Sequence, residues 1–373
     1  MDFRGHNSQN RQRPMNGPGW IRWSLALPLL TLNLFVLRQL TVPLAPFPGL
    51  FLTAALIAFL LDIPCVWLTG RGLPRWMAIV MVTLVTISAL VFAGITLVPL
   101  LIDQLGQLIN ALPGLLSEAE GWITSLQSLA DARGLPSEFG DLSSDLLTRA
   151  GRVASQISQR LLGILGATLG TTINTVIVLV LAVFFLLGGR SIAAGLARWL
   201  PTDWRELVTS TLSRTFRGYF AGQVLLALIL AVGQIVVFTV LKIPYGVLFA
   251  VLIGFTTLIP YASALTIIAV SGLLAFQDPK TGLEILVAAI LVGQLVDQVI
   301  QPRLMGSIVG LQPAWLLIAL PIGAKAGELY GFGELLGLLL AVPVASCLKT
   351  LVDAWAERQG IPASGDLIRP ERG

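Results

Sequence analysis

One segment of the chain places four polar side chains at helical spacing among apolar neighbours. They are Gln294, Asp297, Gln298 and Gln301, at positions i, i+3, i+4 and i+7. At about 100° per residue they share one narrow face of a helix. A carboxylate costs roughly 2.5 to 3.5 kcal/mol at the centre of a membrane helix and normally faces a protein interior or a water-filled cavity. The stripe predicts a pathway for a cation or proton. The alternatives are contacts that hold helices together, or an Asp297 near a membrane interface.

A second pair of polar residues lies on another predicted helix. Gln223 and Gln234 are eleven residues apart and are therefore nearly aligned on one face, with Ala227 between them. They could complete the polar pathway, or they could form ordinary hydrogen bonds between helices.

Two apolar stretches, 244–276 and 311–348, are too long for one straight crossing. A helix of 33 or more residues would measure about 50 Å, against a hydrocarbon core of ~30 Å. We therefore predict non-helical backbone near Ile259–Tyr261 and within Gly323–Gly333. Interrupted segments of this kind often mark binding sites in transporters, and simple kinked helices are the alternative. The chemistry-bearing residues of these stretches are Pro260, Tyr261, Gly323, Gly327, Glu328 and Glu334.

The residue patterns of familiar enzymes are missing from the sequence. The single histidine, His6, precedes the first apolar run, which excludes a Ser–His dyad and a histidine-based metal site. The sequence has no GxSxG elbow, no phosphate loop and no CxxC pair. Cys65 and Cys347 lie in apolar segments and read as small core residues. We predict a protein that is not an enzyme and has no cofactor and no metal site.

The composition indicates a bilayer as the main solvent. Of the 373 residues, 55% are hydrophobic and 12% are charged, and the mean hydropathy is +0.84. Soluble domains carry about 25% charged residues. Apolar runs long enough to cross must be helical, because each backbone group in lipid has to be paired within its own segment. We predict an all-α integral membrane protein of about eight transmembrane helices, with two broken or re-entrant segments. The predicted spans are 24–40, 47–68, 76–102, 163–187, 219–241, 244–276, 283–301 and 311–348.

The distribution of arginine predicts the orientation of these spans. Arg71, Arg75 and five arginines within 190–217 lie in short connections, and the N-terminal tail is also arginine-rich. Positive residues concentrate on the cytoplasmic side, which explains the net charge of +4 without nucleic acid. Both termini are expected in the cytoplasm. The predicted units are a cytoplasmic tail 1–23, helices 1–3 in 24–102, an amphipathic extracytoplasmic lobe 103–162, core helices 4–8 in 163–350, and a cytoplasmic tail 351–373. The lobe should contain two or three amphipathic helices on the membrane surface, or a solvated helical hairpin.

An ordered series of short motifs extends over most of the chain. The series is Arg217-Gly-Tyr-Phe-Ala-Gly-Gln223, Ile243-Pro-Tyr-Gly246, Leu258-Ile-Pro-Tyr261, Gln294-Leu-Val-Asp297, Gln301-Pro-Arg-Leu-Met-Gly306, Val309-Gly-Leu-Gln-Pro313 and Leu340-Ala-Val-Pro343. It resembles the autoinducer-2 exporter family of bacterial membrane transporters. The resemblance implies an eight-span inner-membrane protein with a variable lobe after the third span. It also implies a homo-oligomer and the export of a small molecule, with autoinducer-2 as the name-giving substrate. Some relatives resemble sodium/proton antiporters.

Three functions stay open at this point. The first is a secondary transporter or exporter of a small polar solute. In it the stripe lines the pathway or couples transport to an ion gradient. The second is a monovalent cation/proton antiporter that uses Asp297 and either Glu328 or Glu334. The third is a non-transporting membrane scaffold that recruits a partner through the 103–160 lobe. The expected partners are the lipid bilayer, a small polar solute or a monovalent cation or proton, and further copies of the chain, but no nucleic acid.

Overall fold

The apolar segments of the chain fold as helices throughout the part that the computed structural model describes. That part comprises residues 19–44, 47–132, 168–305 and 313–359, with single residues between 152 and 163. The elements are α1 (Gly19–Thr41), the short η1 (Val42–Leu44), α2 (Phe47–Thr69), α3 (Arg75–Ala132), α5 (Thr168–Ala197), α6 (Thr202–Val240), α7 (Gly246–Thr256), α8 (Ala262–Ala275), α9 (Pro279–Leu295), the π-helical η2 (Val296–Ile300), α10 (Gln301–Met305), α11 (Pro313–Leu329) and α12 (Glu334–Arg358). The all-α prediction is confirmed.

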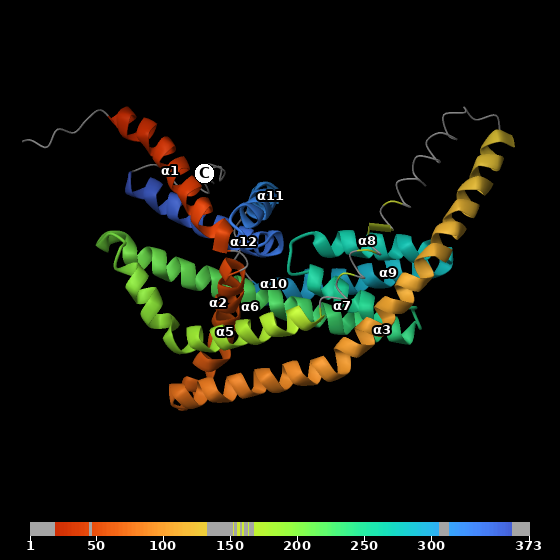
Figure 1. Cartoon of the computed structure of the whole chain (residues 1–373), viewed down its shortest axis with the longest axis horizontal. Helices are drawn as coiled ribbons and strands as arrows, with labels where there is room; N and C mark the ends of the chain where they lie inside the picture. Colours follow the sequence, from red (N-terminus) through yellow and green to blue (C-terminus); the bar gives the residue numbers. More distant parts are fainter. Residues whose placement is uncertain are drawn as a thin grey trace, which may run out of the picture.

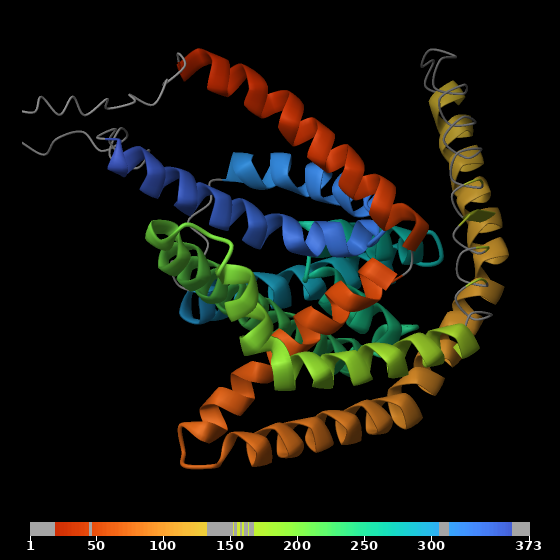
Figure 2. The ribbon, with the colours of Figure 1, turned by 60° about the vertical axis from the view of Figure 1, so that its left-hand side comes forward.

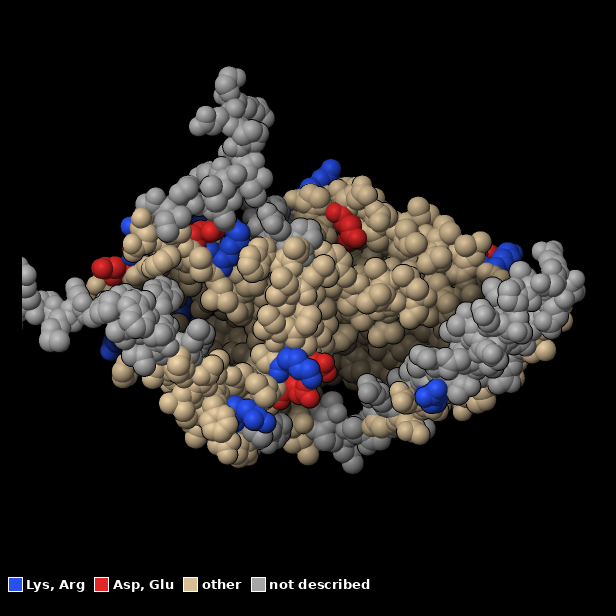
Figure 3. All heavy atoms as spheres, turned by 90° about the horizontal axis from the view of Figure 1, so that it is seen from above, with Lys and Arg blue, Asp and Glu red and all other residues tan. Residues whose placement is uncertain are grey.

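Membrane-spanning length is common among these helices. Within the described residues, six helices are long and apolar enough to cross a bilayer: α2, the first 40 residues of α3, Ile173–Ala197 of α5, α6, Pro279–Leu304, and α12. Large apolar side chains cover their outer surfaces, among them Phe92, Ile95 and Phe184. The face seen in Figure 3 is mostly uncharged, and its charged side chains lie in a few small groups. This surface fits a lipid environment.

The third predicted span and the beginning of the predicted lobe form one continuous helix. α3 has 58 residues, which corresponds to about 87 Å at ~1.5 Å per residue. It includes Pro99 and Pro113, and Figure 1 shows it bending before its last part extends away from the other helices. Proline removes a helix hydrogen bond and commonly causes such bends. Most of the remaining lobe, residues 1–18 and 360–373 of the tails, and residues 306–312 lie outside the described residues.

The buried side chains form two groups. In the first group, Ala58 and Cys65 of α2 pack with Ile79 of α3 and with Ala182 and Leu186 of α5. We call α2, the first part of α3, and α5 the N-terminal helix group. The second group is centred on α6 to α9 and includes Phe238, Phe249, Leu274 and Ile285, and we call it the C-terminal helix group. The two groups lie next to each other in Figures 1 and 2.

Both predicted interruptions are present. Between α7 and α8 the backbone turns at residues 257–261, and Tyr261 adopts the left-handed conformation with φ of 66°. Between α11 and α12 it turns at residues 330–333, where Gly331 and Gly333 have φ of 73° and 95°. Glycine adopts positive φ without steric cost, which explains the second turn. Gly323 and Gly327 lie within helix α11, so the second interruption is confined to the end of the predicted range.

Candidate functional site

The predicted polar stripe lies where α9 becomes π-helical. Gln294 belongs to the last turn of α9, Asp297 and Gln298 belong to η2, and Gln301 begins α10. All four side chains are exposed, and Gln298 Nε2 donates to Gln294 Oε1 across 2.7 Å. A π turn holds an extra residue and occurs frequently at functional sites. The stripe therefore faces away from the helix packing of a single chain, on a distorted turn.

The interruption between α7 and α8 receives a hydrogen bond from α6. Gln223 is buried, and its Nε2 donates to the carbonyl oxygen of Thr257 in the turn. In a continuous helix this carbonyl would accept from the residue four positions later, but the chain has left the helix there. Gln223 satisfies the acceptor instead. Sequence reasoning assigned Gln223 to the polar pathway and assigned Pro260 and Tyr261 to an interrupted segment. The structure brings Gln223 to the turn that contains the other two.

The stripe and this turn lie at similar positions along α6. Gln234 donates to Ala289 and Gly233 packs on Val292, while η2 and α10 also contact α6. These contacts require α9 to run antiparallel to α6, because a parallel course would carry α10 beyond the end of α6 at Val240. Counting back from Gly233, Asp297 is level with about residue 228 of α6, within two turns of Gln223. Two of the candidate features thus lie at similar depths, about 7 to 8 Å apart along α6.

Gln234 connects α6 with α9. Its side chain is fully buried, and its Nε2 donates to the carbonyl oxygen of Ala289 across 3.0 Å. Its Oε1 is buried without a partner among the described residues. The hydrogen bond matches the alternative in which Gln234 joins helices, and the unpartnered oxygen remains a buried acceptor.

The glycines of the second interrupted stretch bring two helix backbones into contact. A Cβ atom added at Gly323 would stand 2.5 Å from the carbonyl oxygen of Gly337, and one added at Gly337 would stand 3.1 Å from Gly327 Cα. Helices α11 and α12 therefore form a hairpin that only glycine permits at these positions. Glu328 forms an exposed ion pair with Lys325 at 2.6 Å, and Glu334 is exposed at the start of α12. Within the described part of the chain, no ion pair or hydrogen bond joins these acids to Asp297.

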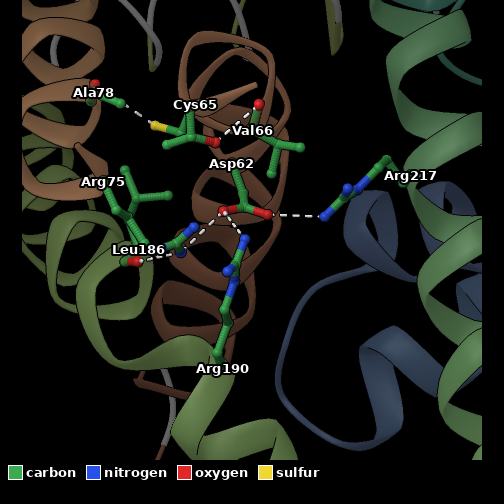
Figure 4. Close-up of polar contacts among 9 residues, drawn as sticks. Asp62, Cys65, Val66, Arg75, Ala78, Leu186, Arg190 and Arg217 are labelled. Carbon is green, nitrogen blue, oxygen red and sulfur yellow. Dashed lines mark hydrogen bonds and ion pairs between the residues drawn. The ribbon is translucent and has the colours of Figure 1, made fainter. Parts of the chain in front are cut away.

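Sequence reasoning missed the largest ionic cluster of the described residues. Asp62 of α2 accepts a hydrogen bond from Arg75 of α3 at 3.1 Å and one from Arg217 of α6 at 2.8 Å. Arg190 of α5 approaches the same carboxylate to 3.9 Å. Figure 4 shows the three guanidinium groups reaching Asp62 from different sides. We call these four residues the Asp62 cluster. It joins the N-terminal helix group to α6.

A signal for the Asp62 cluster was present in the sequence. Asp62 is the only acidic residue between Asp2 and Asp103, and it lies inside an apolar helix where an unpaired carboxylate is costly. Arg75 precedes the apolar run of α3, Arg190 follows that of α5, and Arg217 precedes that of α6. The alternation of spans brings these three ends to one side of the membrane. Asp62 is the acid that they could share.

The comparisons with known proteins agree with this architecture. The family model described as AI-2E family transporter matches residues 25–357. A protein of Synechocystis sp. named as a transport protein, sll0060, is 31% identical over 91% of this chain and 98% of its own length. A second protein of that organism named as a transport protein, sll0063, is 33% identical over 88% of this chain and 83% of its own. The protein of Escherichia coli K12 named as a permease, PerM, is 29% identical over 83% and 87%.

These matches extend over nearly the whole chain and include both helix groups. They agree with the resemblance that the ordered motifs suggested, and with a surface that is apolar over six long helices. Two of these relatives are named as transport proteins and one as a permease. The chain is a multi-pass bacterial membrane protein and belongs to the AI-2E family of transporters.

Proposed function

We propose that this protein is a secondary transporter that exports a small polar solute, similar to autoinducer-2, across the bacterial inner membrane. The observation that carries the proposal is the π turn of Val296–Ile300. Asp297 and Gln298 lie in this turn on an apolar helix of spanning length, within two helical turns of the level of the bend between α7 and α8. Polar side chains and unwound backbone at a common depth are the usual components of a transporter binding site.

The proposed pathway has two groups of components. Asp297, Gln294, Gln298 and Gln301 supply carboxylate and amide groups for a polar solute or a coupling proton. The interrupted segments would move to open and close access to the stripe. They contain Pro260, Tyr261 and the hairpin glycines Gly323 and Gly327. Gln223 holds the turn beside Pro260, and Gln234 fixes α6 against α9. Glu328 and Glu334 are exposed acids on the hairpin side and would interact with a cation after it leaves the stripe.

Orientation and assembly are part of the proposal. The arginines at the ends of α2, α5 and α6 favour a cytoplasmic location for both termini. An exposed polar stripe on a spanning helix is costly in lipid, so contact with further copies of the chain or with water would relieve that cost. The first argument supports an orientation with the end of α3 outside, and the second supports a homo-oligomer in the inner membrane.

The experiment is a flux assay with purified protein in proteoliposomes. A panel of small polar solutes is loaded, and efflux is followed with and without an imposed proton or sodium gradient. Solute efflux that responds to the proton gradient supports the exporter. Proton movement driven by sodium or potassium without any solute supports the second candidate, an antiporter, which the single carboxylate in the stripe favours. The absence of all flux above empty liposomes would leave the scaffold as the better account.

A further inference from the structure

The charges of the Asp62 cluster do not balance. Three guanidinium groups surround one carboxylate, and each carboxylate oxygen already accepts one hydrogen bond. Arg190 is 3.9 Å from the carboxylate, which is beyond hydrogen-bond distance, and its side chain is 65% exposed. The cluster therefore carries two positive charges in excess, and Arg190 presents donors that Asp62 does not use.

Two further donors in the cluster have no acceptor among the described residues. They are Arg75 Nη1 and Arg217 Nε, and both atoms are buried. A buried N–H without a partner is unfavourable, because its hydrogen bonds to water are lost and not replaced. The remainder of Arg75 is held by Asp62 and by the carbonyl oxygen of Leu186 at 3.5 Å. Because these two atoms are buried, an anion from outside would reach the exposed donors of Arg190, and the excess charge of the cluster favours an anion at that position.

The cluster lies at the edge of the membrane. Trp67 and Trp76 are 56% and 65% exposed on the same end of the helix group, and Arg71 stacks on Trp67 at 3.5 Å. Tryptophan and arginine gather at the level of lipid headgroups. Asp62 precedes Trp67 by five residues, or about 7 to 8 Å along α2. Phosphate groups of lipids and of the cytoplasm meet the helices at this level.

We propose that the Asp62 cluster binds a phosphate group through Arg190 and Arg217. A guanidinium fork matches phosphate oxygens in a bidentate geometry, and basic sites between transmembrane helices bind anionic headgroups. The phosphate comes from an anionic phospholipid or from free phosphate. It would neutralise the excess charge at the junction of the N-terminal helix group with α6. The site is independent of the transported solute and of Asp297.

The test is a titration of the full-length protein in a neutral detergent. The titrants are short-chain phosphatidylglycerol, short-chain phosphatidylcholine and inorganic phosphate, each at constant ionic strength, and the thermal unfolding midpoint is recorded. We expect phosphatidylglycerol to raise the midpoint at lower concentration than phosphatidylcholine, whose choline carries a compensating positive charge. A comparable rise with inorganic phosphate identifies free phosphate as the source, and its absence identifies the lipid. No rise with either anion overturns the proposal.

Three variants separate the site from general charge effects. Arg190→Gln should weaken the apparent affinity for the anion about tenfold, because it removes one charge-assisted contact. It should fold, since Arg190 makes no hydrogen bond to Asp62. Arg190→Lys should retain part of the affinity. Arg71→Gln removes a charge at the same membrane edge without touching Asp62, and it should bind like the wild type. Equal losses in Arg71→Gln and Arg190→Gln, or no loss in either, contradict a specific site.

Discussion

The carboxylate of Asp62 accepts a 2.8 Å hydrogen bond from Arg217, although 155 positions of the chain separate the two residues. Arg217 also lies over the ring of Phe59, with 5.7 Å between its Cζ atom and the ring centroid. The two contacts connect α2, which packs with α3 and α5, to α6, which is the centre of the C-terminal helix group. This bond is thus a point at which the two helix groups are held together.

We expect the Asp62 cluster to contribute to stability in an order set by its geometry. Asp62→Asn leaves three arginines without a carboxylate and should cost about 1 to 3 kcal/mol, less than a fully buried pair because the side chains are partly exposed. Arg217→Gln and Arg75→Gln should cost less, and Arg190→Gln least. Thermal unfolding in detergent measures the order. A larger loss in Arg190→Gln than in Asp62→Asn is incompatible with this arrangement.

The topology can be checked with single cysteines in a chain whose Cys65 and Cys347 are replaced. A membrane-impermeant maleimide added to intact cells should label Ser128→Cys, which is exposed near the end of α3. It should leave Ser210→Cys unlabelled, since this exposed position of α6 lies among the arginines that favour the cytoplasm. Permeabilised cells serve as the control, in which both cysteines react. The reverse labelling pattern would invert the orientation.

Asp297→Asn should abolish gradient-driven flux and leave expression near the wild-type level. The amide keeps the shape and most hydrogen bonding of the side chain, but it cannot bind and release a proton. Flux of the identified solute in proteoliposomes, and proton movement reported by a pH-sensitive dye, measure the effect. The matched control is Glu284→Gln on the same helix, where Glu284 pairs with Lys280 at 3.8 Å. Wild-type flux with an unchanged pH dependence in Asp297→Asn would assign the stripe a purely structural role.

The hairpin of α11 and α12 should not tolerate a side chain at its glycine contacts. Gly337→Ala places a methyl group against the backbone of Gly323 and Gly327, and overpacking of this kind costs roughly 1 to 3 kcal/mol. Gly272→Ala in α8 is the control, because nothing lies within 4 Å of its added Cβ atom. It should be neutral or slightly stabilising, as alanine favours a helix over glycine. Similar unfolding midpoints for the two variants would contradict the close backbone contact.

Asp278 should make the start of α9 sensitive to acid. Its carboxylate accepts a 2.6 Å hydrogen bond from the Thr281 hydroxyl and further bonds from the backbone N–H groups of Lys280 and Thr281. These bonds, that of Thr281 first, hold the pKa of Asp278 below its ordinary value. A lowered pKa stabilises the fold above the unfolded-state pKa of about 3.9, and this contribution is lost as the pH falls through the folded-state pKa.

The matched variant for this effect is Asp278→Asn, which still caps the helix but does not titrate. The wild type should be more stable than the variant at about pH 6, and the difference should shrink toward about pH 3. Unfolding midpoints of both proteins across this range provide the measurement. A difference that stays constant with pH would show that the carboxylate charge makes no contribution.

Much of the fold could be predicted from the sequence, because the bilayer imposes strict rules on helix length. Each predicted apolar segment coincides with a helix or, at 244–276 and 311–348, with a helix pair. The continuity of α3 through Asp103 was not predictable, because amphipathic and apolar patterns share the same period. The π turn was not predictable either, since the stripe at residues 294–301 reads as an ordinary helix face.

The candidate site was predictable in part. Asp297 and the glutamines could be identified because they are polar residues in an apolar helix. Pro260 and the glycines of 323–337 could be identified because proline and glycine interrupt helices. Predicting the hydrogen bond from Gln223 to the Thr257 carbonyl would require knowing how α6 and α7 are aligned along each other, and a single sequence does not give this alignment. The Asp62 cluster forms only where α2, α3, α5 and α6 meet, and one sequence does not show this meeting. Each of its arginines is also explained by the preference of positive residues for the cytoplasmic side, so none of them indicated a cluster.

The antiparallel register of α6 and α9 has an electrical consequence. The apolar part of α6 begins after Arg217 and ends at Val240, and Asp297 is level with about its middle. A cation or proton bound there would have crossed roughly half of the membrane potential. Since one elementary charge gains about 2.3 kcal/mol per 100 mV across the whole membrane, its binding should change by about 1 kcal/mol per 100 mV. Occupancy of Asp297, and any transport coupled to it, should therefore depend on voltage even at constant pH.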